Sequence, residues 1–381
     1  MTGRRDWKPP AIMTALAALL AGSVVLSLLG GVADDATGTA EPTPTPSPAA
    51  TATPAPPEVT IAHETCCTQA ARFFDVPWRS SAAVRSATVA LAPSPPFECA
   101  ATVADGGRDG RLGCSGFLAG ATDYVATLTV TTEGGSYETA HQFRTMGDRL
   151  DDVQWFTEFE DPTGPPLACA AASCRIVQLF TTGDDKMTAE EILEFGMPFN
   201  RSRDPGLDPA AIATIMKRLD PRNDYHYYVH RTREEATAAA VYWLLRSGKP
   251  VIAITLAGQH APVVVGFRGT YGTYYDDPAN SITGMIVMDP QRGDLRAETN
   301  RRPDIYRAAT FQTGHLLGME EWLGHEWWLA FPYWSTDRSG VSMDRNDGVY
   351  PRPHWSGSYV IVVADGDSEH PSDLMGRVRY R

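Results

Sequence analysis

Three residues that are far apart in the sequence are of the types that thiol chemistry needs. Cys169 opens an Ala-rich apolar stretch, His260 stands at the head of a short run of valines, and Asp289 ends a second apolar run. A thiolate can attack a carbonyl carbon while an imidazole takes and returns a proton and a carboxylate orients the imidazole. We therefore expect the three residues to meet in one cleft as nucleophile, base and orienting acid.

The position of Cys169 favours a reactive cysteine. Two prolines precede it closely, and the apolar stretch from it to Phe180 predicts a helix with the cysteine in the first turn. Unpaired backbone N–H groups at such a turn stabilise a thiolate. The alternative is a small buried hydrophobic residue, as most free cysteines are. Cys174 has its Cα about 8 Å further along that helix, too far for a disulfide with Cys169, and is predicted to be a core residue.

Several helices are predicted from their termini. Thr188 with Glu191, and Thr232 with Glu235, have the spacing of capping boxes. Asp208 followed by proline predicts another helix start, and Gly248 is a suitable end for the helix that begins after Thr232.

Most of the predicted strands follow these helices. Apolar runs predict strands over Val251–Leu256, His260–Gly266, Gly284–Met288 and Tyr359–Val363. Helices followed by a cluster of antiparallel strands favour an α+β fold over a doubly wound one. The alternating aromatic stretch Val153–Phe159 predicts one more strand, at an edge.

These motifs resemble those of the peptidase C39-like group of papain-fold cysteine peptidases. That family has Gly-x-Pro-Val, then His with a run of Val and Gly, then Asp-Pro, and this chain has Gly248-Lys-Pro-Val, Gly258-Gln-His260-Ala-Pro-Val-Val-Val-Gly and Asp289-Pro. Cys169-Ala-Ala-Ala-Ser stands where the family usually has Cys-Gly-Pro-Ala-Ser. The resemblance implies a papain-like α+β domain over residues 150–365.

The resemblance also implies a role for each site residue. Cys169 would be the nucleophile, His260 the general base and Asp289 the residue that orients the imidazole. The family usually has a Gln that donates to the oxyanion, but here Val153-Gln-Trp-Phe-Thr-Glu158 puts Glu158 in that place, and Gln154 lies four residues early. A carboxylate there would repel the developing oxyanion unless it were protonated.

Three functions therefore remain open for this domain. The preferred one is a cysteine peptidase or amidase that cleaves a peptide or amide bond. The second is a catalytically inactive papain-fold module that binds a ligand, and the third is an acyl- or amide-transfer enzyme with the same triad.

Residues 58–147 have the pattern of an all-β sandwich. Short alternating stretches rich in Val, Thr and Tyr are separated by Gly and Pro clusters. The stretch Leu118-Ala-Gly-Ala-Thr-Asp-Tyr124 resembles fibronectin type III domains around their corner tyrosine, and Phe143-Arg-Thr145 resembles their last strand. This resemblance implies a binding or spacing module with no chemistry of its own.

Four cysteines lie in the same region. Cys99 and Cys114 flank a predicted hairpin, which favours a disulfide between adjacent strands. The pairing of Cys66 and Cys67 stays open. A metal site made from the four is the alternative, although no second Cys-x-x-Cys or His pair supports it.

The N-terminal 57 residues carry export signals. Basic residues precede the uncharged run 10–32, which is long enough for a membrane anchor within residues 1–35 and predicts that the C-terminal domains lie outside the cell. A signal peptide that is cleaved near Ala33, giving a secreted protein, is the alternative. Residues 36–57 form a Pro/Thr-rich linker, and residues 366–381 are expected to be a loose tail.

The overall composition narrows the choice of partners. The 381-residue chain has a formal net charge of −13, which argues against nucleic acid as a partner. We expect a peptide or a cell-wall or surface protein as ligand, and the motifs call for no metal or organic cofactor.

Overall fold

The structure is a computed structural model, and its described residues all lie within Pro54–Arg381. It describes residues 56–62, 69–158, 168–201, 206–230, 232–255, 258, 260–273, 277–290, 319–323, 359–364 and 378–380. The predicted anchor 1–35, most of the linker 36–57, and Cys66 and Cys67 lie outside these ranges. No helix within the described ranges is both long and apolar enough to cross a bilayer.

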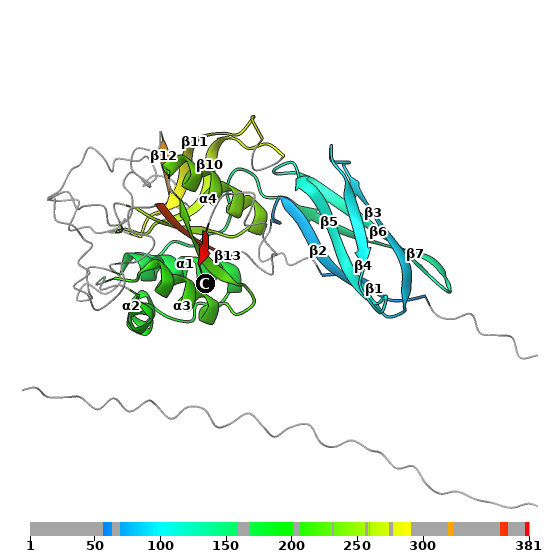
Figure 1. Cartoon of the computed structure of the whole chain (residues 1–381), viewed down its shortest axis with the longest axis horizontal. Helices are drawn as coiled ribbons and strands as arrows, with labels where there is room; N and C mark the ends of the chain where they lie inside the picture. The colour runs from blue at the N-terminus through cyan, green and yellow to red at the C-terminus, as the bar shows by residue number, and fades with distance from the viewer. Residues whose placement is uncertain are drawn as a thin grey trace, which may run out of the picture. The chain divides into compact units, whose positions relative to one another are not determined.

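The first seven strands form two antiparallel sheets that share one core (Figure 1). The strands are β1 (Val59–Ile61), β2 (Phe73–Ser80), β3 (Val84–Ala92), β4 (Cys99–Val103), β5 (Asp109–Phe117), β6 (Asp123–Thr132) and β7 (Gly135–Arg144). The sheet orders are β1-β2-β5-β4 and β3-β6-β7. Constant-type immunoglobulin sandwiches use this strand order. The resemblance to fibronectin type III domains therefore stays a prediction from the sequence.

Period-2 alternation fills the space between the two sheets. On β2, Phe74, Val76 and Trp78 are buried while the residues between them are exposed. Tyr124, near the start of β6, is also buried and accepts a hydrogen bond at its hydroxyl from the backbone N–H of Ala119, at 3.2 Å. Such a corner fixes the loop before the strand to the core.

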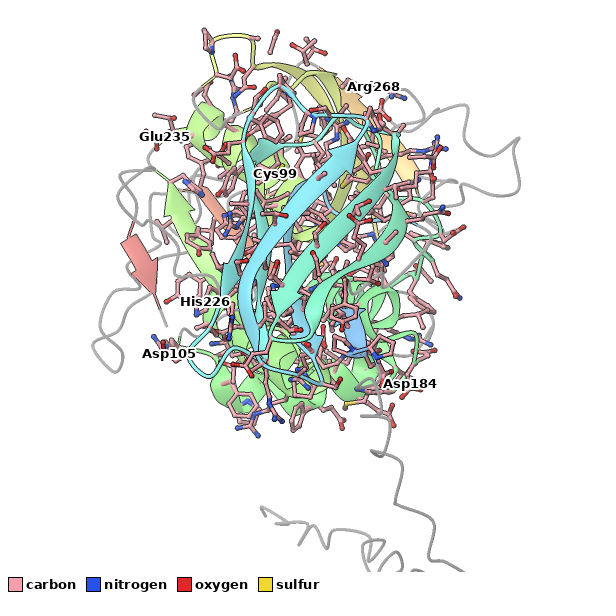
Figure 2. The ribbon with its side chains drawn as sticks, turned by 90° about the vertical axis from the view of Figure 1, so that its right-hand side faces the viewer. Cys99, Asp105, Asp184, His226, Glu235 and Arg268 are labelled. Atoms are coloured by element: carbon pink, nitrogen blue, oxygen red, sulfur yellow. A yellow bond between two sulfur atoms is a disulfide. The ribbon has the colours of Figure 1, made fainter. Side chains whose placement is uncertain are left out.

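The predicted disulfide is confirmed. Cys99 and Cys114 lie directly opposite each other on β4 and β5 and are bonded through their sulfur atoms. Figure 2 shows Cys99 at one end of β4 and Asp105 in the hairpin loop at the other end.

The rest of the described chain forms helices packed against a third sheet of seven strands. Its helices are α1 (Cys169–Thr182), α2 (Ala189–Gly196), the short 3₁₀-helix η1 (Met197–Phe199), α3 (Pro209–Leu219) and α4 (Arg233–Ser247). Its strands are β8 (Tyr225–His230), β9 (Val251–Ile254), β10 (Val263–Thr270), β11 (Ser281–Met288), β12 (Met319–Leu323), β13 (Tyr359–Ala364) and β14 (Val378–Tyr380). The sheet order is β12-β11-β10-β9-β13-β8-β14, with antiparallel neighbours throughout.

The predicted helix starts are confirmed. The Thr188 hydroxyl accepts from the N–H of Glu191, whose carboxylate accepts from the N–H of Thr188, so α2 begins with a complete capping box. Thr232 and Asp208 cap α4 and α3 through their side-chain oxygens, which accept from the N–H groups of Glu235 and Ala211. Gly248 ends α4 with φ of +66°, a conformation that side chains rarely adopt.

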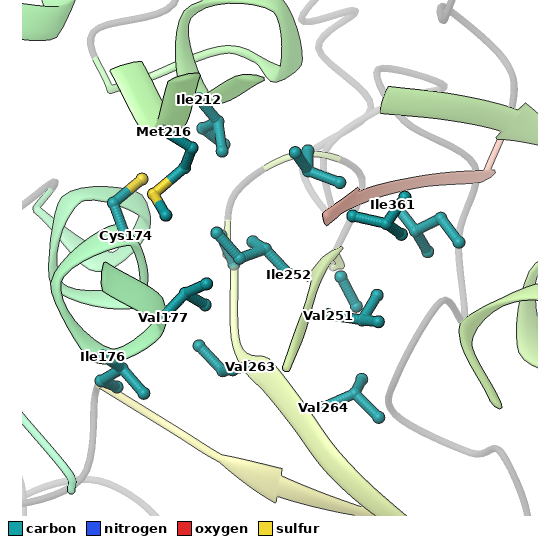
Figure 3. Close-up of a cluster of buried hydrophobic side chains, with 14 of the residues drawn as sticks. Cys174, Ile176, Val177, Ile212, Met216, Val251, Ile252, Val263, Val264 and Ile361 are labelled. Carbon is teal, nitrogen blue, oxygen red and sulfur yellow. The ribbon is translucent and has the colours of Figure 1, made fainter. Parts of the chain in front are cut away.

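Helices cover both faces of this seven-stranded sheet (Figure 1). Successive residues of a strand point to opposite faces. Tyr227 of β8 lines a cavity with α3, whereas Tyr228 stacks on Trp243 of α4 at a centroid distance of 5.2 Å. Figure 3 shows Val177 of α1 next to Ile252 of β9, in the core between α1 and the sheet.

The segment that follows β7 joins the edge of β10. The N–H of Leu150 donates to the carbonyl of Val265, and the N–H of Phe267 donates to the carbonyl of Asp148. Gly266 lies between them, where a Cβ would come within 2.8 Å of the Arg149 backbone. Only glycine allows this close approach. The segment thus holds β10 on the side opposite to β11.

Three sequence expectations differ from the structure. The strand predicted for Val153–Phe159 is wrong for residues 153–158, whose hydrogen bonds run to the loop after β11. The strand predicted from His260 begins only at Val263, because Pro262 lacks an N–H to donate. Within the tail 366–381, Val378–Tyr380 form β14 and pair with β8.

Replacing Tyr124 with phenylalanine tests the corner in the sandwich. Tyr124→Phe leaves the Ala119 N–H without its acceptor, so we expect the free energy of unfolding to fall by about 1 to 3 kcal/mol. Denaturant unfolding followed by tryptophan fluorescence measures this change. Tyr137→Phe is the matched control, because the Tyr137 hydroxyl bonds Gly134 at an exposed position. Equal losses in both variants would contradict a special role for the corner.

Candidate functional site

Cys169 is the first residue of α1, as the sequence predicts. The N-cap residue Ala168 makes no side-chain cap, and the first helical bond runs from the N–H of Ala172 to the carbonyl of Ala168. The backbone N–H groups of the first turn therefore point out of the helix end beside the sulfur. Cys169 is 8% exposed and is a free thiol.

Ser173 docks this helix against the segment that carries His260. It lies one turn after Cys169, is fully buried, and donates a hydrogen bond from its hydroxyl to the carbonyl of Ala261. Residues four apart lie on the same helix face. Cys169 therefore lies on the face of α1 that packs against the segment of His260 and Ala261.

His260 and Asp289 form a buried pair. The imidazole Nε2 lies 2.7 Å from the Asp289 carboxylate Oδ1, and both residues are 2% exposed. Their meeting follows from strand register, because Val263 near the start of β10 pairs with Met288 at the end of β11. The two residues just outside this pair of strand ends come together, so the predicted contact across neighbouring strands is confirmed.

The Cys169 side chain lies near enough to the imidazole to influence its protonation. Burial by itself lowers the pKa of His260, but the charge and hydrogen bond of Asp289, and then the hydrogen bond and charge of Cys169, outweigh it. The pKa of His260 therefore lies well above its ordinary value of 6.5. His260 Nδ1 makes no well-formed hydrogen bond within the described ranges, so the sulfur contact is looser than the carboxylate contact. Loose catalytic hydrogen bonds are common in enzymes without substrate.

The turn after β11 is held by the segment 153–158. The indole N–H of Trp155 donates to the backbone carbonyl of Asp289 at 2.8 Å, and the N–H of Glu158 donates to the carbonyl of Pro290 at 3.0 Å. Glu158 is 7% exposed, and its backbone bonds the residue that follows Asp289. Gln154 is exposed and is not part of this buried group.

Arg175 fixes the same segment against α1. Its guanidinium carbon lies 3.9 Å from the centre of the Phe156 ring, and the guanidinium forms two hydrogen bonds with the Asp185 carboxylate. The segment 153–158 is thus placed by α1 on one side and by the turn after β11 on the other.

Sequence reasoning missed three of these positioning residues: Ser173, Trp155 and Arg175. Ser173 had a signal, because it lies four residues after Cys169 on the same helix face. The contacts of Trp155 and Arg175 reach across the fold and leave no local pattern in the sequence.

Cys174 lies in the core, as predicted, and is fully buried with a free thiol. Burial, and to a smaller extent the charge of Cys169, raises the pKa of its thiol. Figure 3 shows its side chain beside Met216 of α3. The described ranges contain no group of three or more His, Cys, Asp or Glu residues arranged to hold a metal ion.

No protein-family model matches this sequence, and no curated protein matches it either. The two family resemblances therefore rest on the sequence motifs quoted above, and the chemistry of the site is argued from its own residues.

The raised pKa of His260 predicts how the stability of the fold depends on pH. The protonated imidazole stabilises the folded state next to Asp289, and this contribution is complete below the ordinary pKa of His and is lost as the pH rises through the raised folded pKa. We expect Asp289→Asn to lower the free energy of unfolding by about 3 kcal/mol near pH 6.5, since it breaks a buried pair. The loss shrinks at higher pH.

Unfolding by denaturant at a series of pH values from 6.5 upward measures this difference. Asp148→Asn is the control, because Asp148 pairs with Arg268 where both side chains are solvent-exposed. A difference between wild type and Asp289→Asn that stays constant with pH would contradict the assignment.

Proposed function

We propose that this protein is a thiol-dependent hydrolase that cleaves a peptide or amide bond outside the cell, similar to C39-like cysteine peptidases. The observation that carries the proposal is the buried His260–Asp289 hydrogen bond, with Cys169 near enough to the imidazole to raise its pKa. A helix start carries the sulfur, and the carboxylate is buried. Nucleophilic catalysis requires a nucleophile, a base and a group that orients the base.

The residues divide the reaction between them as follows. His260 takes the thiol proton, and the Cys169 thiolate attacks the carbonyl carbon of the substrate to form a tetrahedral oxyanion. The N–H groups of the first turn of α1 lie where they can donate to that oxyanion. His260 then gives its proton to the leaving amine, and a thioester remains on Cys169.

Water completes the cycle. With His260 again acting as base, water attacks the thioester carbonyl, and the acid product leaves as the thiol regains its proton. Asp289 stays hydrogen-bonded to Nε2 of His260 throughout the reaction and stabilises the positive charge of the imidazolium. The raised pKa of His260 fits this role, because it favours the protonated imidazole beside a thiolate.

A second candidate function is a catalytically silent binding module, and Glu158 is the observation that favours it. Glu158 is buried and its backbone N–H bonds Pro290, the residue after Asp289, whereas the C39-like pattern has a neutral amide at this position. An ionised carboxylate near a developing oxyanion would oppose the reaction. An ionised Glu158 is compatible with binding a peptide or a surface protein, because binding forms no oxyanion.

The proposed location is the outer face of a cell membrane, with secretion as the alternative. The basic and then uncharged N-terminal segment supports export, and the linker would hold the domains away from the membrane. The Cys99–Cys114 disulfide is in keeping with an oxidising compartment.

Cys169→Ala tests whether the protein is an enzyme. We expect wild-type protein to be labelled by a thiol-directed activity probe and to cleave a mixed peptide library, detected by mass spectrometry. Because the nucleophile is lost, Cys169→Ala should lower cleavage about a thousand-fold or more and abolish labelling. Cys174→Ala is the matched control and should keep both, since Cys174 is buried with a raised thiol pKa. Absence of labelling at Cys169 in wild type would favour the binding module.

Glu158→Gln separates the two candidate functions in a different way. If Glu158 weakens the oxyanion site, the amide variant supplies a donor, and we expect amide-bond cleavage near neutral pH to rise by about 100-fold. The measurement is the rate constant for peptide cleavage in both proteins from pH 5 to pH 8. Glu138→Gln, at a solvent-facing position of β7, is the control. An unchanged rate would show that the Glu158 carboxyl group does not act on the reaction.

A further inference from the structure

A cavity lies between α3 and β8, on a part of the fold that the proposed reaction does not use. We call it the α3 cavity. It has a volume of about 200 Å³ and is lined by Ala213 of α3, Tyr225 and Tyr227 of β8, and the cationic residues Arg201, Lys217 and Arg218. Ala213 and both tyrosines are buried, so they form its floor, whereas Arg201 and Arg218 are exposed at its rim.

The rim carries a local positive charge on a protein that is acidic overall. Lys217 is paired with Asp224 at 2.6 Å, whereas Arg218 forms no ion pair in the part of the chain that the structure describes. With a formal net charge of −13, the chain as a whole repels anions. Arg218 at the rim of the cavity therefore marks a place where an anionic group is favoured.

An apolar surface continues from the same rim. The Arg218 guanidinium carbon lies 4.6 Å from the centre of the Phe199 ring and 5.8 Å from that of Phe195. The two rings meet edge to face at 5.7 Å. Phe195 and Met197 are 37% and 38% exposed, large values for such side chains. Stacking on these rings holds the guanidinium in place without neutralising its charge.

We propose that the α3 cavity binds an acidic side chain of a peptide, whose apolar neighbours lie on Phe195, Met197 and Phe199. The cavity is smaller than the roughly 300 to 1,000 Å³ of sites for drug-sized ligands, so it suits a single side chain. An arginine that is already oriented on aromatic rings binds a carboxylate in a fixed geometry. A small free anion would leave the exposed apolar residues unused, which favours a peptide.

This site goes beyond the proposed hydrolase function and does not depend on it. Its test therefore uses the full chain with Cys169→Ala, so that cleavage of the probe cannot affect the result. The probe is a fluorescein-labelled short peptide in which Leu alternates with Asp, and binding is followed by fluorescence anisotropy. A second peptide, with Asn in place of Asp, and inorganic phosphate as a competitor form the other arms.

We expect the acidic peptide to bind and the Asn peptide to bind at least about ten-fold more weakly, since charge-assisted hydrogen bonds are lost. Adding Arg218→Gln should weaken binding of the acidic peptide by about ten-fold, and adding Lys217→Gln should weaken it to a smaller extent. Adding Arg85→Gln is the control, because Arg85 is an exposed arginine on β3 paired with Glu133. Arg218 is exposed, so a thermal melting point equal to that of the parent is expected for its variant.

Three results would overturn the proposal. The first is equal binding of the acidic and Asn peptides, and the second is equal binding by Arg218→Gln and its parent. The third is displacement of the acidic peptide by phosphate at concentrations comparable with the peptide, which would mark a site for small free anions.

Discussion

The contact between His260 and Asp289 is the interaction on which the described site depends. It exists because β10 and β11 pair in a register that brings the start of one strand beside the end of the other. An ion pair at 2% exposure is costly unless both partners are held in place. The Trp155 hydrogen bond to the Asp289 carbonyl supplies part of that restraint. Breaking the pair would leave a charged group in the core.

The second constraint is the docking of α1. A helix that is buried around almost its whole circumference has little freedom to slide, and the Ser173 hydroxyl bond to Ala261 fixes its height against the sheet. That bond therefore also fixes the position of Cys169, one turn earlier on the same helix. A reactive side chain on a buried helix end is held more precisely than one on a loop.

Local signals in the sequence were sufficient for several elements. The caps at Thr188 and Asp208, the helix from Cys169 and the Cys99–Cys114 bridge all depend on residues close in sequence or on directly paired strands. The residues of the site could also be chosen by type and order. Whether these residues meet depends on the register of β10 with β11, which no local sequence pattern determines.

The features that the sequence did not reveal depend on contacts between distant segments. The residues after Val153 alternate like a strand, but the turn after β11 and Arg175 take up their hydrogen-bonding groups and aromatic faces. The α3 cavity had no motif, because its cations come from α3 and from the residues before it, and its floor from β8. Tertiary contacts decided these cases over local preference.

The contact between the Cys169 sulfur and the His260 imidazole is the central claim about the site, and the pKa of His260 reports it directly. It can be measured by NMR titration of the ring protons in wild type and in Cys169→Ala. Because both the hydrogen bond and the charge of Cys169 raise the pKa of His260, the account predicts a lower pKa in the variant. An identical pKa in the two proteins would contradict it, since the sulfur would then not reach the imidazole.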